Sequence, residues 1–281
     1  MVKIQAGNFA MGDALDKTST PHNVWVSDFT CEEKLVTWTL WQQVCKLAMD
    51  DYGYTFGPGP NGKADDHPVQ MVTWYNAIAW CNGRSEVEGI PPCYRSGDHG
   101  DVIRSGSPDN RTDNVLCDFH LPGYRLLTEA EWEKMARGGV EGQRFPNGNH
   151  IDQKTANYFG QTYWPYDDGP SGHDPRWNKP DVRPYTSPVG SFAPNKFGVF
   201  DAAGNVSEWV WDWFDKGYYA YSPQADPQGP DGPGDPTAPA RVIRGGGWNM
   251  YASNCRCCDR GSCRPGSAFN YLGFRCLQNR L

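Results

Sequence analysis

Four cysteines gather near the end of the chain, at Cys255, Cys257, Cys258 and Cys263. Thiolates are preferred ligands of soft metal ions, so a cluster this dense could hold one. The four positions lack the spacing of a familiar ligand set, and no nearby histidine completes one. No pair among the ten cysteines has the spacing of a zinc ribbon. We therefore do not expect a metal site at this cluster.

The thiols lie in a segment of unusual pattern. Regular-looking motifs, Arg241–Trp248, Ala252–Arg256 and Leu272–Cys276, are separated by residues with neither a helical nor a strand period. The irregular residues mix aromatic, small, charged and thiol side chains. A fixed frame that carries arbitrary side chains suits an adjustable binding surface better than a catalytic site. We predict that ligand contacts come from Tyr251, Cys257, Cys258, Asp259, Gly261, Ser262, Cys263, Arg264, Gly266, Ser267, Ala268, Phe269, Asn270 and Tyr271. Phe269 and Tyr271 have an alternative role as core residues.

Charge divides the chain into two parts. The formal net charge of −7 argues against a nucleic-acid partner, whereas the segment from Arg241 onward holds seven Arg and one Asp. We expect Arg244, Arg256, Arg260 and Arg275 to hold loops through carbonyl and carboxylate groups, together with Trp248 and Asn254. Arg264 lies among the irregular residues, so we expect it to contact a partner.

Composition limits the architecture. With 32 Gly and 23 Pro in 281 residues, long helices are disfavoured, while 12 Trp can build a substantial core. No apolar run is long enough to span a membrane. The first residues lack the apolar stretch of a signal peptide, so an exported form would take its leader from outside this sequence. Ten cysteines favour an oxidising compartment.

Periodicity predicts the elements that position the C-terminal segment. Alternating apolar residues predict strands over 2–12 and 22–31, and helices should begin near Thr39, after Thr73 and after Thr128. We expect one domain, 1–281, in which the terminal strands meet. Polar residues 83–120 are predicted to be an insertion, stapled by a disulfide between Cys93 and Cys117. The Pro- and Gly-rich residues 222–240 predict a flexible loop, and 241–281 form the binding region.

Five motifs together resemble the formylglycine-generating-enzyme family. They are Gly7–Gly12, His67–Trp74, Tyr124–Trp132 with Ala136–Gly139, Gly198–Trp209, and Arg244–Gly246 followed by Leu272–Arg275. The resemblance covers nearly the whole chain. It implies an α+β fold of the C-type-lectin-like kind, rich in loops and poor in regular secondary structure.

The same resemblance argues against the family's copper-dependent oxidase activity. Those enzymes hold copper with two cysteines, which align with Met250 and Cys255 here. The positions of the active-site serine and of the arginine after the first cysteine carry Gly247 and Tyr251. A tryptophan of the family motif is replaced by Ser207. Copper(I) needs soft thiolate ligands, so we expect neither copper nor enzyme activity.

The C-terminal segment further resembles the variable proteins that diversity-generating retroelements rewrite, among them treponeme surface lipoproteins. Their variable regions share the motifs Arg-Gly-Gly-x-Trp, Ala-Ser-Asn-Cys-Arg and Gly-Phe-Arg. Adenine-directed mutation of AAC codons never encodes Lys, Glu, Gln, Trp or Met, and residues 257–271 contain none of these. Met250 does not fit such a codon. The resemblance implies a lipid-anchored protein at the cell surface or outer membrane, which binds a protein or another surface molecule. We expect a monomer, because the sequence shows no heptad repeat and no long exposed apolar strand. A copper oxidase and a non-catalytic accessory module are the alternatives.

The family resemblance also implies calcium and a disulfide. One calcium set would use Asn157, Tyr158, Asp181 and Arg183, with Tyr158 and Arg183 contributing their main-chain carbonyls, and a second would use Asp201, Gly204, Val206 and Glu208. Asp201 and Glu208 have the alternative role of capping turns. The implied disulfide joins Cys81 to Cys276 and would tie the second helix to the last strand.

Overall fold

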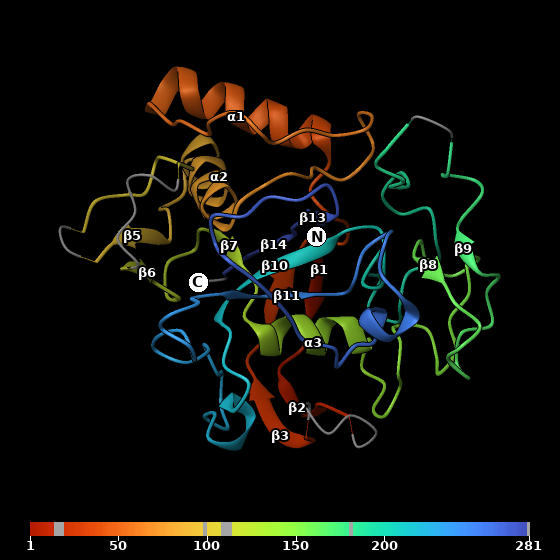
Figure 1. Ribbon diagram of the computed structural model, residues 1–281. Coiled ribbons are helices and arrows are strands. Elements are labelled where there is room, and N and C mark those ends of the chain that lie inside the picture. The colour runs from red at the N-terminus through yellow and green to blue at the C-terminus, as the bar shows by residue number, and fades with distance from the viewer. Residues whose placement is uncertain (14–19, 98–99, 108–113, 180–181, 280–281) are drawn as a thin grey trace.

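The computed structural model describes residues 1–13, 20–97, 100–107, 114–179 and 182–279. Two four-stranded sheets lie at the centre, with helices around them (Figure 1). The first sheet has the order β1 (Val2–Ile4), β4 (Phe29–Cys31), β14 (Cys276–Gln278) and β7 (Tyr124–Leu126). Because β4 pairs with both β1 and β14, the two ends of the chain share one sheet, as predicted.

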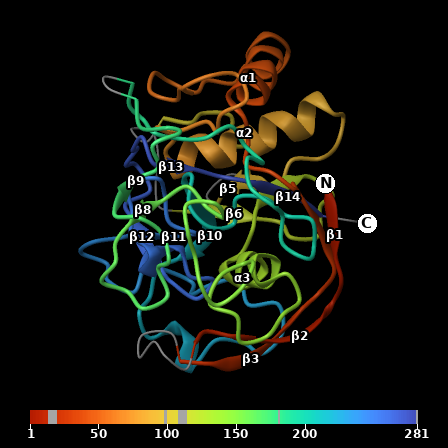
Figure 2. The same ribbon diagram turned by 90° about the vertical axis from the view of Figure 1, so that its right-hand side faces the viewer.

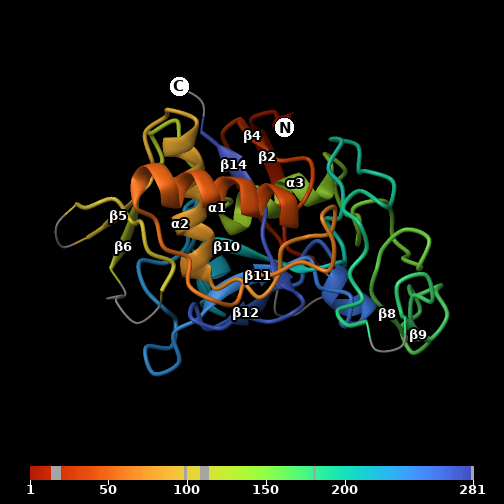
Figure 3. The same cartoon turned by 90° about the horizontal axis from the view of Figure 1, so that it is seen from above.

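The second sheet carries the C-terminal segment. Its order is β12 (Gly261–Cys263), β11 (Arg241–Arg244), β10 (Ser207–Trp213) and β13 (Leu272–Gly273), and Figure 3 shows β10, β11 and β12 side by side. Successive strand residues point to opposite faces. Trp209 and Val210 therefore enter two different hydrophobic clusters, one on each face.

Two helices cover one of these clusters. α1 (Trp38–Tyr52) buries the predicted face of Trp41, Val44, Cys45 and Ala48. α2 (Trp74–Val87) is capped by the Thr73 side chain, as predicted, and is buried on most sides because it packs against α1 and β7. The polar excursion predicted from residue 83 begins later than expected, because this helix continues through Val87.

The third helix carries charge into the interior. α3 (Glu129–Arg137) has the predicted capping box of Thr128 and Glu131, and it ends at Gly138 with φ of 60°. It contacts β10, β11 and the ribbon of β2 (Gly7–Met11) and β3 (His22–Val26). Glu129 and Glu133 are nevertheless almost completely buried. Buried carboxylates need cationic partners, and these come from the C-terminal segment.

Short ribbons and turns complete the molecule. β5 (Tyr94–Ser96) pairs with β6 (Val115–Cys117), and β8 (Phe159–Gly160) pairs with β9 (Gly172–His173). Figure 2 shows the ribbon of β2 and β3 below α3. Two 3-10 turns span Tyr218–Ala220 and Ala252–Cys255. In the described part of the chain, no helix is long and apolar enough to cross a membrane.

The Pro- and Gly-rich loop 222–240 is mostly exposed, but part of it is tied to β3. The Ala225 main chain bridges to Trp25. Asp226 has φ of 43° and accepts hydrogen bonds from Ser27 N at 2.6 Å and Ser27 Oγ at 2.7 Å. Short polar side chains such as Asp tolerate this left-handed conformation.

Candidate ligand-binding site

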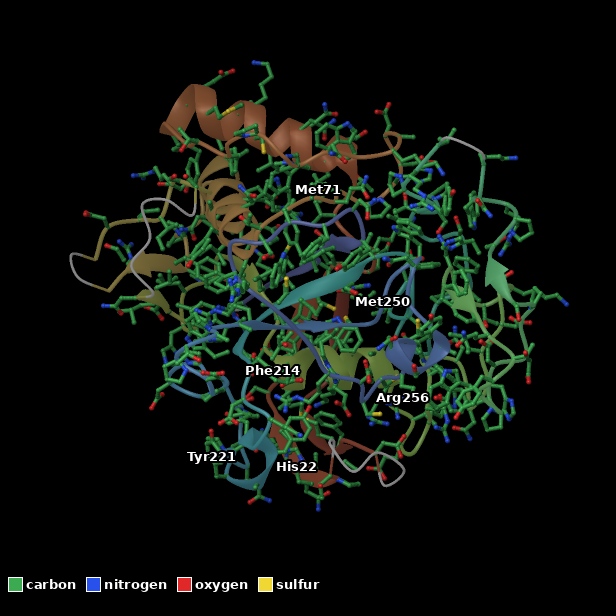
Figure 4. The ribbon with its side chains drawn as sticks, in the orientation of Figure 1. His22, Met71, Phe214, Tyr221, Met250 and Arg256 are labelled. Atoms are coloured by element: carbon green, nitrogen blue, oxygen red, sulfur yellow. The ribbon has the colours of Figure 1, made fainter. Side chains whose placement is uncertain are left out.

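A pocket of about 440 Å³ lies where β11 and β12 meet the loop that leads to β13. Met250, labelled in Figure 4, lies beside the first residue of β10, where its sulfur accepts a hydrogen bond from Ser207 Oγ at 3.5 Å. The lining consists of Ser207, Ile243, Arg244, Gly245, Gly246, Met250, Asn254, Asp259, Gly261, Ser262, Cys263, Arg264, Ser267, Phe269 and Tyr271. Eight of these fifteen are predicted contact residues: Asp259, Gly261, Ser262, Cys263, Arg264, Ser267, Phe269 and Tyr271.

Two buried arginines hold the main chain on which these side chains stand. Arg244 donates to the carbonyl groups of Asp259 and Cys257 and pairs with Glu133 at 2.5 Å. Arg260 donates to both oxygens of Glu129, at 2.7 Å each. Because a planar guanidinium matches a carboxylate in two places, the Arg260 pair also fixes orientation.

The remaining members of the expected frame act in the same way. Arg275 donates to both oxygens of Glu208, at 2.6 and 2.8 Å, and to the Phe200 carbonyl at 2.9 Å. Arg256 bonds to the Ser253 carbonyl, and Trp248 Nε1 bonds to the Asn270 carbonyl, at 2.8 and 2.9 Å. The predicted loop-holding roles are therefore confirmed. We call Arg244, Trp248, Asn254, Arg256, Arg260 and Arg275 the frame residues.

Two neighbouring carboxyl groups below the segment have pKa values shifted in opposite directions. Burial acts to raise the pKa of Glu129, but the guanidinium groups of Arg260 and Arg244 hold that pKa below its usual value. Asp212 lies beside Glu129 and accepts a hydrogen bond from the Glu129 main-chain N–H at 2.7 Å. Burial, followed by the negative charge of Glu129, raises the pKa of Asp212 well above its ordinary value. Of the two, Glu129 is the one that forms an ion pair with Arg260.

Several side chains on the pocket side of the segment do not hold the main chain in this way. Ser262, Arg264 and Phe269 are exposed, and the Phe269 ring stacks on Tyr271 with centroids 5.1 Å apart and planes 6° apart. At 40% exposure Phe269 is not a core residue, whereas Tyr271 is partly buried and packs against the core cluster that α1 and α2 cover. Tyr251, Gly266, Ala268 and Asn270 are also at least partly exposed, but they lie outside the pocket lining.

The prediction that Cys257 and Cys258 lie on the surface and contact a ligand is wrong. Cys257 is 0% and Cys258 1% exposed, and Cys257 packs into the cluster that α3 covers. The Arg244 guanidinium draws the Cys257 carbonyl inward, which turns this stretch toward the interior. Burial raises the pKa of the Cys257 thiol to about 12. Irregular spacing predicts a loop but not which side chains of that loop point inward.

An aromatic wall beside the pocket was not predicted. Tyr251 is 43% exposed and lies edge-on against Phe159, with ring centroids 5.8 Å apart. Phe159 in turn contacts His173, which packs on Trp248. The main chain fixes this arrangement, because Phe159 N donates to the Met250 carbonyl at 2.9 Å. No periodicity marks Phe159 in the loop-rich residues 140–197, so its role could not be predicted from sequence patterns.

The groups that replace the family's copper ligands do not form a copper(I) site. Met250 offers only a thioether, and Cys255 is fully buried, with its pKa raised by burial. A serine in place of Gly247 would be crowded, because its Cβ would lie 3.2 Å from the Tyr271 carbonyl oxygen and 3.3 Å from the Tyr271 Cβ. A paired thiolate set is needed for copper(I), and these residues do not supply it.

In the second expected calcium set, only some of the side-chain oxygens are free to bind an ion. Asp201 keeps one buried oxygen, Oδ1, without a hydrogen-bond partner, while Oδ2 accepts from Gly190 N at 2.6 Å. Both oxygens of Glu208 are used by Arg275. The four residues therefore do not fit as a complete ligand set, because Glu208 would have to leave its arginine.

Of the first expected calcium set, Asp181 lies outside the described residues. Asn157 uses its side-chain amide to bond the Tyr185 carbonyl at 2.8 Å, and the Tyr158 hydroxyl bonds to Asp167. Arg183 is exposed. In the described part of the chain, no three His, Cys, Asp or Glu side chains form a metal cluster.

No disulfide joins the ten cysteines, all of which lie among the described residues. The thiols of Cys81 and Cys276 lie within hydrogen-bonding distance of each other, so their expected disulfide stays a prediction. Strand register places Tyr94, not Cys93, opposite Cys117, and the disulfide expected between Cys93 and Cys117 also stays a prediction.

Residues 1–280 match the model of the sulfatase-modifying factor enzyme 1-like domain family. The chain belongs to this family, and the α+β fold expected from the motifs is confirmed. It is 41% identical to the formylglycine-generating enzyme of Streptomyces coelicolor over 298 residues, covering 99% of this chain and 88% of that enzyme. It is also 31% identical to the chaperone protein LppX of Paenibacillus barcinonensis over 262 residues, covering 88% and 78% of the two chains.

Among solved structures, the Treponema denticola variable protein 1 is similar over its whole length. The TM-score is 0.76 with 30% identity, and the match covers 100% of this chain and 95% of that one. The resemblance to treponemal variable proteins of this fold is therefore confirmed. CarF shares the fold alone, with a TM-score of 0.72 and 21% identity over 100% and 98% of the two chains.

Proposed function

We propose that the chain is a non-catalytic ligand-binding protein whose C-terminal side chains are diversified by a retroelement. The observation that carries this proposal is a division of labour within one segment. Frame residues hold the main chain from below, while most predicted contact side chains around the pocket are at least partly exposed. Substitutions at the exposed positions can change a ligand without removing a contact that the fold needs.

The mechanism is surface complementarity. Exposed rings such as Phe269 and Tyr251 supply contact area at low entropic cost, and Ser and Arg side chains supply hydrogen bonds. By the same resemblance the proposal includes display at a cell surface through a lipid anchor and a ligand that is a protein or another surface molecule. A monomeric state is also part of the proposal. Calcium remains part of it too, and in the second set Asp201 has an oxygen without a hydrogen-bond partner whereas Glu208 is held by Arg275.

Sequencing of the last forty codons from many independent clones of the source population tests this function. We expect substitutions confined to exposed positions such as Tyr251, Ser262, Arg264 and Phe269, with the frame residues and the buried Cys257 and Cys258 unchanged. An invariant segment would contradict diversification.

A second candidate function is an oxidase of the formylglycine-generating type, favoured by the 41% identity to the Streptomyces enzyme. It requires copper binding and oxygen-dependent oxidation of a cysteine-containing peptide. Copper(I) titration of the wild-type chain and of Cys255→Ser distinguishes the two functions. Under the binding function, neither protein turns over the peptide, and Cys255→Ser changes copper affinity little because no second thiolate faces it.

A further inference from the structure

The pocket is a positively charged region of an acidic protein. The whole chain has a net charge of −7, yet seven Arg and one Asp lie between residues 241 and 281. The described frame arginines use their guanidinium groups on carbonyls and carboxylates. Arg264 differs, because among the described residues its exposed guanidinium makes neither a hydrogen bond nor an ion pair, although it lines the pocket.

The acidic residue in the lining does not cancel this charge. Asp259 pairs with Arg256, whose Nη2 lies 3.1 Å from Asp259 Oδ1, and it also receives Asn254 Nδ2 at 3.4 Å. Arg244, buried in the lining, is already paired with Glu133. Arg264 therefore supplies the positive charge of the lining that has no described partner, and its field attracts anions to the pocket mouth.

Next to the free cation lies an exposed flat surface. The Phe269 ring, 40% exposed, is supported from one side by its parallel stack on Tyr271. Ile243 and Met250 add apolar surface, and Ser262 and Ser267 add hydroxyl groups. A supported ring binds another ring or a branched aliphatic group, and a pocket of about 440 Å³ has the size of small-ligand and side-chain sites.

We propose that this pocket of the present chain binds an acidic peptide segment. An Asp or Glu carboxylate of the peptide pairs with Arg264, and an adjacent aromatic or branched aliphatic side chain packs on Phe269. The serine hydroxyl groups bond to the peptide main chain. This inference rests on the proposed binding function and names the chemical class of its ligand.

A random twelve-residue peptide display library, selected on the immobilised full chain, is the probe. On the wild-type chain we expect enrichment of peptides with Asp or Glu beside Phe, Tyr, Trp, Leu or Ile. Arg264→Glu should weaken these peptides at least tenfold and enrich peptides with Lys or Arg instead. The matched control is Lys196→Glu, an exposed charge reversal outside the pocket lining, which should retain the wild-type preference.

A second variant separates the apolar contact from the charge. Phe269→Ala should weaken the same peptides about tenfold but leave the preference for acidic residues intact. Melting curves of all variants establish that each is folded.

Several outcomes overturn the inference. Enriched peptides without acidic residues, or unchanged selection by Arg264→Glu, would reject the acidic class and leave the binding function standing. The absence of any enriched peptide, or binding only of heparin as an anionic polysaccharide, would reject a peptide ligand. Failure of the binding function itself appears separately, as an invariant C-terminal segment in the population sequences.

Discussion

Arg260 and Arg264 are the same residue type, four positions apart, in opposite environments. The Arg260 side chain is 5% exposed and donates hydrogen bonds to both oxygens of the buried Glu129. Arg264, in contrast, is exposed and makes no ion pair among the described residues. Phe269 and Phe274 repeat the contrast, since Phe269 is 40% and Phe274 1% exposed. One short segment thus combines residues that the fold requires with residues that it tolerates. An adjustable binding surface on a constant fold needs this separation.

The strongest test of that contrast is the pair of arginines. Arg260→Ala leaves Glu129 buried without its main partner, so we expect a loss of about 3–5 kcal/mol in the free energy of unfolding. Arg264→Ala removes no internal contact and should change that free energy by less than about 0.5 kcal/mol. Urea unfolding followed by tryptophan fluorescence measures both. Similar losses in the two variants would break the comparison.

The two phenylalanines test the same division for apolar side chains. Phe274 packs edge-on against Trp41 and Trp80, with centroids 6.0 and 5.4 Å away, so Phe274→Ala should cost about 4 kcal/mol. Phe269→Ala should cost about 1 kcal/mol or less, because its ring is partly in water already. Thermal melting of both variants reports the difference. A large loss from Phe269→Ala would assign that ring to the core.

Asp201 differs from the acidic residues that pair with frame arginines, because one of its two carboxylate oxygens has no hydrogen-bond partner. Burial raises its pKa from 3.8 to about 6 in the folded protein. Between these values the folded state holds the proton more tightly than the unfolded state. The unfolding free energy should therefore fall as pH rises from about 4 to about 6, by up to about 3 kcal/mol, and stay level above that range.

Asp201→Asn isolates this effect, because an amide oxygen can still accept the Gly190 N–H. We expect the variant to match the wild type in stability near pH 4 and to exceed it near pH 7. Repeating the unfolding curves with excess calcium tests the proposed calcium set, since an ion bound at Asp201 would close the gap at pH 7. A gap that does not depend on pH would reject the raised pKa.

The smallest effect should come from the exposed side of the segment. Ser262, Arg264 and Ser267 are replaced together by Ala, and we expect the free energy of unfolding to change by about 1 kcal/mol or less. The matched change on the inner side, Cys257 and Cys258 replaced by Asn, should cost several times more because both side chains are buried. Equal losses would show that the segment does not separate into two sides.

Much of the local structure follows from residues next to each other in the chain. Thr73 and Thr128 cap helices because their hydroxyl groups meet main-chain N–H groups three residues later. Gly138 ends α3 because it adopts a left-handed conformation without a Cβ clash. The motifs between Arg241 and Arg275 also identified the arginines that hold the loops.

The predicted strands 2–12 and 22–31 each divide into two, since the chain leaves the first sheet to form a separate ribbon. That change depends on pairing with β14, more than two hundred residues away, and alternation along one strand carries no information about it.

The sequence by itself determined the family fold, the helix starts and the basic C-terminal segment. It did so because caps, periodicity and motifs act over a few residues. Only the tertiary structure decided which side chains of that segment are exposed and line the pocket. Arg244 turns Cys257 inward, α3 brings Glu129 to Arg260, and Phe159 arrives from a distant loop to support Tyr251. These outcomes depend on contacts between residues far apart in the chain, where burial and charge pairing are set together.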